Sequence, residues 1–324
     1  MPSTITHAYF GEDLFKKIPK ESKKIIIDEK KSLMMFSQSM DALMFYNIYN
    51  IFPGKKIRDL APIFHTNKVN DFFTNLIEYI KENKYYNDPK TLSFLYGLIS
   101  HYALDSTTHP YIFYKTGLYN KDDKTTLKYN AMHTYMENYI DNYFLNNRNK
   151  NNKINLNEFC FDLSKFSHEL NLSIDNTFYK TFGINNMSKI YYNSLKHMKT
   201  FIMLFRFDNY GIKKNLYKCI DKLKPKNTFQ FNSISYKSDN YDTYDFLNSN
   251  NNIWYYPVDN NISSNKAFLE LYNDALKKAI DIINEINNYF FKNIKIDINK
   301  LFNNLSYVTG IDCEANKKQK FFEF

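Results

Sequence analysis

Two segments of the chain share one arrangement, in which a carboxylate follows a histidine by four residues. They are His101–Asp105 and His133–Glu137. On an α-helix, side chains four residues apart differ by about 40° of rotation and one turn of rise, so they leave the same face. An imidazole and a carboxylate that point into one space can bind a divalent metal ion. If the two pairs converge, the chain folds around a metal site that lies between helices.

The composition favours long helices for the rest of the chain. There are only 7 glycines and 8 prolines among 324 residues, too few breakers and turns for a protein with many strands. The 44% of residues that are apolar suffice for a sizeable core. We therefore predict an all-α fold, a multi-helix bundle with the metal site between helices. We expect residues 1–324 to form a single domain, with the metal ligands in residues 1–145.

The apolar periodicity indicates where the longer helices lie. It predicts helices over residues 68–83, from Asp88-Pro89 through the first histidine pair, and over residues 126–146, 186–206, 211–222 and 264–293. Residues 146–157 form a polar, low-complexity loop, and residues 225–262 form an extended excursion.

We expect the helix of the first pair to break between Ser106 and Pro110. A proline pushes the preceding residue out of the α region, which usually ends a helix. His109 would then lie in a loop or at a helix end.

Spacing alone is weak support for a metal site, because a histidine and a carboxylate four residues apart are more often a pair on a helix surface. The neighbours of both pairs are apolar or aromatic, which favours an inward orientation; they include Tyr102, Leu104, Tyr135 and Met136. A buried histidine beside a buried carboxylate needs partners, and a metal ion supplies them.

Taken in order, the candidate residues resemble the bacterial zinc-dependent phospholipases C, whose fold is shared with fungal single-strand-specific nucleases. The series is His7, Asp41, His65, His101 with Asp105, His109 followed by proline, and His133 with Glu137. The most specific stretch is Gly97–Tyr111. A weaker likeness runs through Trp254-Tyr-Tyr-Pro and Asn304–Gly310.

The resemblance implies a site with two to three zinc ions per chain. His65, His101 and Asp105 would bind the first ion, and the second would be held by His109, His133 and Glu137. His7 and Asp105 would bind the third, so that Asp105 bridges two ions. In the family, an N-terminal tryptophan completes this third site with its amine and carbonyl. Here Pro2 would take that place once Met1 is removed.

Asp41 matches the family's aspartate beside the attacking water, and we expect it to be the catalytic residue. Two divalent ions lower the pKa of a shared water and stabilise charge on phosphate oxygens. Phe45 and Tyr46 follow Asp41 closely and would line a headgroup pocket, where aromatic rings suit a choline cation.

The function implied is a phospholipase C that cleaves the glycerol–phosphate bond of phospholipids, with a phospholipid headgroup or membrane surface as its partner. Two alternatives stay open. A formal charge of +9 and stacking aromatics would also suit a single-strand-specific nuclease acting on single-stranded nucleic acid. A catalytically inactive, metal-stabilised binding protein is the other, although the presence of Asp41 argues against it. No feature predicts a protein partner.

The sequence also bears on location. The first thirty residues contain no apolar run of signal-peptide length, and no stretch is apolar enough to cross a membrane. The three cysteines are widely spaced and indicate neither a disulfide framework nor a cysteine-based zinc site. We expect a cytoplasmic protein with peripheral contact to membranes.

Overall fold

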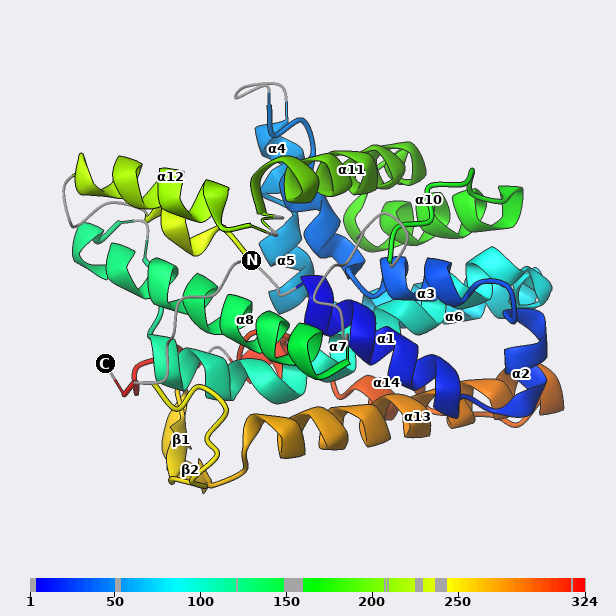
Figure 1. Ribbon diagram of the computed structural model, residues 1–324. Helices are drawn as coiled ribbons and strands as arrows, with labels where there is room; N and C mark the ends of the chain where they lie inside the picture. Colours follow the sequence, from blue (N-terminus) through cyan, green and yellow to red (C-terminus); the bar gives the residue numbers. More distant parts are fainter. Residues whose placement is uncertain are drawn as a thin grey trace.

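The protein is mostly helical, as predicted (Figure 1). The computed structural model describes residues 4–49, 54–120, 122–148, 160–206, 208, 210–224, 230–236, 244–315 and 317–323. Its longer helices are α1 (Thr4–Lys17), α6 (Val69–Glu82), α7 (Pro89–Thr116), α8 (Leu127–Arg148), α10 (His168–Phe182), α11 (Met187–Phe201), α12 (Ile212–Lys222) and α13 (Phe268–Lys292).

Shorter elements join these helices. They are α2 (Lys20–Ile25), α3 (Lys30–Phe36), α4 (Lys55–Arg58), α5 (Ala61–Thr66), α14 (Ile298–Phe302), the 3₁₀-helices η1 (Ser39–Phe45), η2 (Tyr85–Asn87), η3 (Lys124–Thr126), η5 (Phe231–Ser233) and η6 (Cys313–Ala315), and the π-helical turn η4 (Ile202–Arg206). Two short strands, β1 (Trp254–Tyr256) and β2 (Asp259–Ser264), pair antiparallel.

Helix α7 forms the centre of the molecule and is buried along most of its length. Asp88 caps its start, where the carboxylate accepts a hydrogen bond from the Thr91 amide at 2.8 Å. Gly97 allows a close approach to α3, because a Cβ at this position would lie 2.5 Å from the Cβ of Phe36. Helix α13 packs along α7 from the other side (Figure 1).

The predicted break between Ser106 and Pro110 is wrong, because α7 continues through Pro110 to Thr116. Proline removes one helix hydrogen bond, but burial of the helix on both sides of Pro110 compensates for this loss. The continuous helix places His101, Asp105 and His109 at successive steps of four residues, in one row on one face.

Helix α1 is attached to α8 by its N-terminal turn. The Asp141 carboxylate accepts hydrogen bonds from the Thr6 amide and the Thr6 hydroxyl, both at 2.7 Å, and from the Ile5 amide at 3.3 Å. A carboxylate there pairs the open amides of a helix start and favours its dipole. These bonds hold His7 beside the helix that carries His133 and Glu137.

Most other predicted elements agree with the structure to within a few residues. The helix predicted over residues 264–293 begins only at Phe268, because residues up to Ser264 form strand β2. The 3₁₀-helix η5 and most of that hairpin lie within the predicted excursion, residues 225–262. Residues 225–229 and 237–243 of the excursion and residues 149–157 of the predicted polar loop are outside the described residues.

Candidate metal centre

Eight of the predicted site residues converge from five elements. Helix α7 supplies His101, Asp105 and His109, and η1 and α5 supply Asp41 and His65. The remaining three are His7 on α1, and His133 and Glu137 on α8. The metal-ligand candidates among them form two groups, and within each group the ligand atoms lie within 4.8 Å of one another.

The first group comprises Asp41, His65, His101 and Asp105, all buried. The Nε2 of His65 lies 3.3 Å from an oxygen of Asp41. His101 Nε2 lies between the two carboxylates, 3.6 Å from Asp41 and 3.0 Å from Asp105. Asp41 therefore lies close to both histidines of the first group, His65 and His101.

The second group comprises His109, His133 and Glu137. The Nε2 atoms of the two histidines approach the same Glu137 oxygen, His133 at 3.0 Å and His109 at 3.9 Å. Their rings are stacked with centroids 6.0 Å apart. Both histidine side chains are slightly accessible to solvent, with 12% of their surface exposed.

Asp105 connects the two groups and also contacts His7. One of its oxygens lies 3.2 Å from His7 Nε2. The other lies 3.0 Å from His101 and 3.6 Å from Nδ1 of His109 in the second group. The spacing pairs Asp105 with His101, and the resemblance to the family implies that Asp105 bridges two ions. In the structure it contacts His7, His101 and His109.

Three partners of the histidines escaped the sequence analysis. The Nδ1 atoms of His101 and His109 lie 3.0 Å and 2.8 Å from the carbonyl oxygens of Ser37 and Tyr307, respectively. For His133, Nδ1 lies 3.3 Å from the hydroxyl of Thr116. Such contacts fix the tautomer of a histidine and leave Nε2 with a lone pair. Two of these partners, the carbonyls of Ser37 and Tyr307, belong to the backbone of distant segments, and no sequence motif predicts such contacts. Tyr307 does lie in the Asn304–Gly310 stretch that resembles the family.

The ionisation of the site depends on its burial. Burial raises the pKa of Asp41 to about 7. Burial, assisted by the neighbouring His101, lowers the pKa of His65 to about 3. Although burial opposes it, Asp105 and Glu137 raise the pKa of His109 to about 9. Without metal, His65 is therefore neutral at pH 7, whereas His109 carries a proton.

The donor set and its unpaired atoms fit zinc. Both oxygens of Asp41, Nε2 of His65 and His101, and one oxygen of Asp105 are buried with no hydrogen-bond partner in the described structure. With a lone pair at Nε2, His101 is a hydrogen-bond acceptor, and it faces the carboxylate oxygens of Asp41 and Asp105, which are acceptors too. A cation between these atoms would satisfy all of them. Nitrogen and oxygen ligands at about 2.0–2.1 Å in a tetrahedron lie roughly 3.3 Å apart, close to the separations in the first group.

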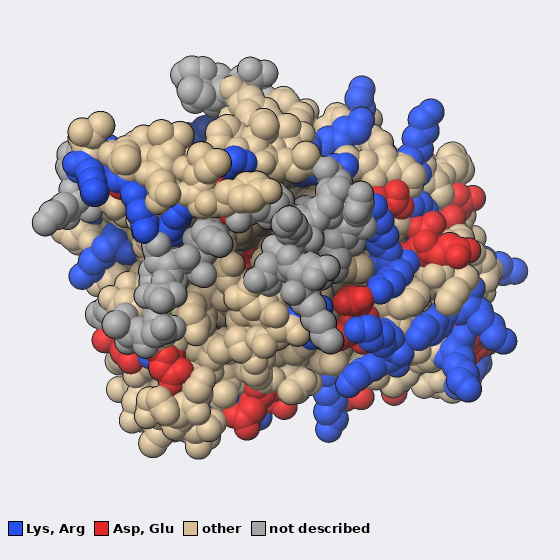
Figure 2. Space-filling model, viewed as in Figure 1, with Lys and Arg blue, Asp and Glu red and all other residues tan. Residues whose placement is uncertain are grey.

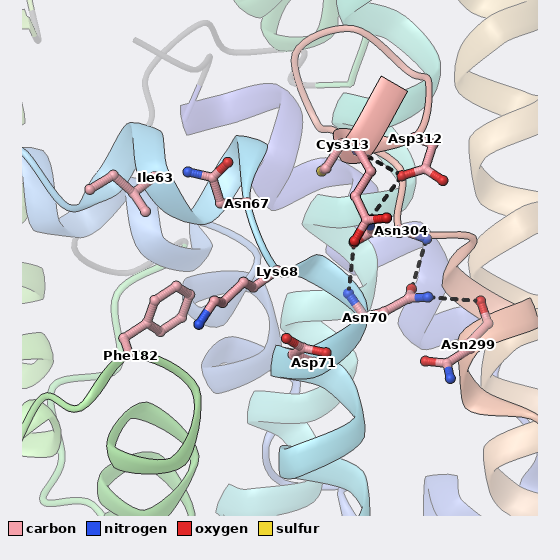
Figure 3. Close-up of a pocket in the computed structure, with 11 residues that line it drawn as sticks. Ile63, Asn67, Lys68, Asn70, Asp71, Phe182, Asn299, Asn304, Asp312 and Cys313 are labelled. Carbon is pink, nitrogen blue, oxygen red and sulfur yellow. Dashed lines mark hydrogen bonds between the residues drawn. The ribbon is translucent and has the colours of Figure 1, made fainter. Parts of the chain in front are cut away.

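Little open space surrounds these residues. A cavity of about 20 Å³ lies between α1, α7 and α8, lined in part by His7, Asp105, His109 and Glu137. A pocket of about 960 Å³ lies on another part of the surface, and no predicted site residue lines it (Figure 3). On its wall, the Asn304 amide groups donate hydrogen bonds to Asn70 and Asp312 at 2.7 and 2.9 Å.

Three predicted residues are not part of this cluster. Phe45 is buried against Phe201, with ring centroids 5.3 Å apart. The ring of Tyr46 packs against that of His197, with centroids 5.9 Å apart. Neither of them lines the 20 Å³ cavity. Pro2, predicted to complete a third zinc site, lies outside the described residues.

The comparisons with known proteins agree with this centre. The model of the family described as zinc dependent phospholipase C matches residues 6–188, more than half of the chain. The chain belongs to this family. All eight converging residues of this zinc-dependent phospholipase C family member, from His7 to Glu137, lie in the matched region. Searches of curated proteins and of solved structures gave no match.

Membership of the family supports zinc as the metal and a phospholipid as the substrate class. No helix in the described part of the chain is long and apolar enough to cross a membrane.

Proposed function

We propose that the protein is a phospholipase C that hydrolyses the glycerol–phosphate bond of phospholipids, releasing diacylglycerol and the phosphorylated headgroup. The observation that supports this most strongly is the linkage of two histidine–carboxylate groups through Asp105. Adjacent cation sites suit a phosphodiester, because both the attacking and the leaving oxygen need stabilisation.

We assign the ligands as the resemblance to the family implies, and the two groups of neighbouring side chains support this assignment. His65, His101 and Asp105 would hold one zinc ion, with Asp41 beside it, and His109, His133 and Glu137 would hold a second. His7, together with the Asp105 oxygen that lies 3.2 Å from it, would contribute to a third ion. When bound, zinc lowers the pKa of water and polarises phosphoryl oxygens.

Asp41 has the position for a general base, because its oxygens lie 3.3 Å from Nε2 of His65 and 3.6 Å from Nε2 of His101. Without metal, burial raises the pKa of Asp41 to about 7. Zinc beside the carboxylate would favour its ionised form, which is the form that accepts a proton. Its carboxylate oxygens would orient the attacking water and accept its proton. His101 lies 3.6 Å away and, through its bond to the Ser37 carbonyl, stays oriented toward Asp41.

Two measurements test this proposal. Elemental analysis of the purified protein should find two to three zinc ions per chain, and a protein without zinc after purification in zinc-containing buffer would contradict every enzymatic assignment. The zinc-loaded protein should release phosphocholine from lecithin. Release of acid-soluble nucleotides from single-stranded DNA, with lecithin left intact, would instead identify the nuclease alternative. Zinc without either activity would indicate the binding protein.

A further inference from the structure

Helix α12 carries an apolar stripe on its solvent side. Ile212 and Leu216 are 70% and 57% exposed, Leu223 directly after the helix is 89% exposed, and Cys219 between them is also exposed. At 100° per residue these four positions fall within about 60° of one another around the helix. Helices on a protein surface normally place the apolar stripe against the core, so this orientation is the reverse of the usual one.

The inner face of α12 is polar and holds the helix in this orientation. The buried Lys214 donates a hydrogen bond from Nζ to the Asn232 carbonyl at 2.9 Å. The Tyr217 hydroxyl donates to the Phe205 carbonyl at 3.0 Å, and the Asp221 carboxylate accepts from the Phe231 amide at 2.8 Å. The helix cannot turn its apolar stripe inward without breaking these bonds.

A second apolar segment lies beside the stripe. Met203, Leu204 and Phe205 of η4 are exposed, and so is Tyr210 between η4 and α12. Lys213 joins the segments through a hydrogen bond from Nζ to the Met203 carbonyl at 2.9 Å. We call Met203, Leu204, Phe205, Tyr210, Ile212, Leu216 and Leu223 together the α12 surface.

Positive charge flanks the apolar stripe of α12 on both sides. Lys213 and Lys224 lie on one side of the stripe, and Lys218 and Lys222 lie on the other. The one acid of the helix, Asp221, faces inward and is occupied by backbone amides. In Figure 1, α12 lies at the upper left edge of the molecule, and Figure 2 shows basic side chains over it.

We propose that the α12 surface docks the protein on phospholipid bilayers that contain anionic lipids. An amphipathic helix that is rich in lysine and low in overall hydrophobicity is typical of elements that lie in the membrane interface. This inference rests on the proposed function, because it supplies the route by which the site would meet a lipid. The α12 surface lies outside residues 6–188, which the family model matches.

The flanking charge favours a membrane over a second copy of the chain. In a twofold dimer the same patch packs against itself, so the lysines of one copy would be brought close to those of the other. An anionic bilayer meets the same lysines with opposite charge and accepts the apolar stripe at the boundary of its acyl chains.

Vesicle binding of the zinc-loaded protein tests the proposal. We would measure co-sedimentation with phosphatidylcholine vesicles that contain phosphatidylserine, for the wild type and for Leu216→Gln/Leu223→Gln. The double variant should bind at least about tenfold more weakly, because both side chains leave the acyl boundary. The matched control, Tyr179→Gln/Ile253→Gln, removes two exposed apolar side chains elsewhere, 59% and 64% exposed, and should bind as the wild type does.

A single charge reversal tests the same proposal with a second variant, in case the double variant misfolds. Lys222→Glu leaves the apolar stripe intact and should weaken binding to the anionic vesicles several-fold, while binding to pure phosphatidylcholine stays unchanged. Equal vesicle binding by the wild type, the double variant and Lys222→Glu would overturn the proposal. So would sedimentation of the wild type as a dimer that the double variant dissociates.

A second assay separates this inference from the proposed function. A short-chain phosphatidylcholine, used below its micelle concentration, reaches the site without a membrane. Wild type and double variant should hydrolyse it equally. If neither hydrolyses it, the proposed function fails, whatever the vesicles show. If both hydrolyse it and bind vesicles equally, only the docking surface is wrong.

Discussion

The two halves of the metal centre differ in burial and in origin. The first group draws Asp41, His65, His101 and Asp105 from three separate elements, and its side chains are at most 9% exposed. The second group comes from α7 and α8 alone, and two of its three residues are 12% exposed. The first group is therefore enclosed, and the second is the part of the centre nearer to solvent.

The two halves also differ in the proton they carry without metal. His65 in the first group has a pKa lowered to about 3 by burial, so it needs no deprotonation before binding an ion. His109 in the second group has its pKa raised to about 9 by Asp105 and Glu137, which outweigh burial. A metal must therefore displace a proton to enter the second group. In the first group the competing proton is that of Asp41, which is lost near pH 7, the pKa to which burial raises this carboxyl. In the second group the proton of His109 competes with metal up to about pH 9.

The largest effect should follow loss of Asp105, which links the halves. Asp105→Asn removes one negative charge from a residue that contacts His7, His101 and His109. Since a metal contributes several kcal/mol to such a transition state, we expect kcat/KM on phosphatidylcholine to fall by at least about 10³-fold. Zinc analysis should show loss from both halves. Asp71→Asn, an exposed acid on α6, is the control and should keep zinc and activity.

A smaller loss should follow removal of the proposed base alone. Asp41→Asn keeps one side-chain oxygen beside His65 but cannot accept a proton, so kcat should fall by about 10²-fold. The zinc count should stay that of the wild type. Loss of one zinc ion in this variant would show that Asp41 acts chiefly as a ligand of the first group.

The protonation contrast predicts a pH dependence of zinc affinity. Protonated His109 competes with zinc below its pKa of about 9, so the affinity of the second group should rise from pH 7.5 by somewhat less than about tenfold per pH unit and level off near pH 9. The first group should change little in this range, because His65 is already neutral. Each half would be measured alone, in His101→Gln and in Glu137→Gln, by competition with a chromophoric chelator. Parallel slopes for the two halves would contradict the assigned protonation of His109.

Sequence reasoning reached the residues of this centre more easily than their arrangement. The order of His7, Asp41, His65 and the two pairs carries the resemblance to the family, and that resemblance, more than the spacing of the pairs, implied which residues are ligands. Helix α1, which carries His7, was not predicted as a helix: residues from Thr4 to Gly11 are buried all round, and no amphipathic period marks them.

Pro110 and Tyr307 show what local rules miss. A proline ends most helices, yet the packing around α7 outweighs that preference here. The contact between His109 and the Tyr307 carbonyl joins segments 198 residues apart. Gly310, at φ +68, lets this segment approach α7, since a Cβ there would lie 2.7 Å from the Ser106 carbonyl oxygen. Neither feature has a signature in sequence spacing.

The smallest expected effect concerns Thr116, whose hydroxyl contacts Nδ1 of His133, the ring nitrogen that points away from Glu137. The Thr116 hydroxyl donates to the Ile112 carbonyl at 2.8 Å and lies 3.3 Å from Nδ1 of His133, so it is placed to accept the proton of that nitrogen. Thr116→Val preserves the shape but removes the acceptor, and we expect zinc affinity of the second group to fall about tenfold.

The first group should keep its affinity in Thr116→Val, because Thr116 contacts none of its residues in the described structure. Thr177→Val in α10 is the matched control: its hydroxyl makes the same kind of bond, to the Ser173 carbonyl at 2.7 Å, away from any histidine. A loss that appears equally in Thr177→Val would reflect helix stability. A loss confined to the second group in Thr116→Val would show that the zinc affinity of each half depends on the hydrogen-bond partners of its own histidines.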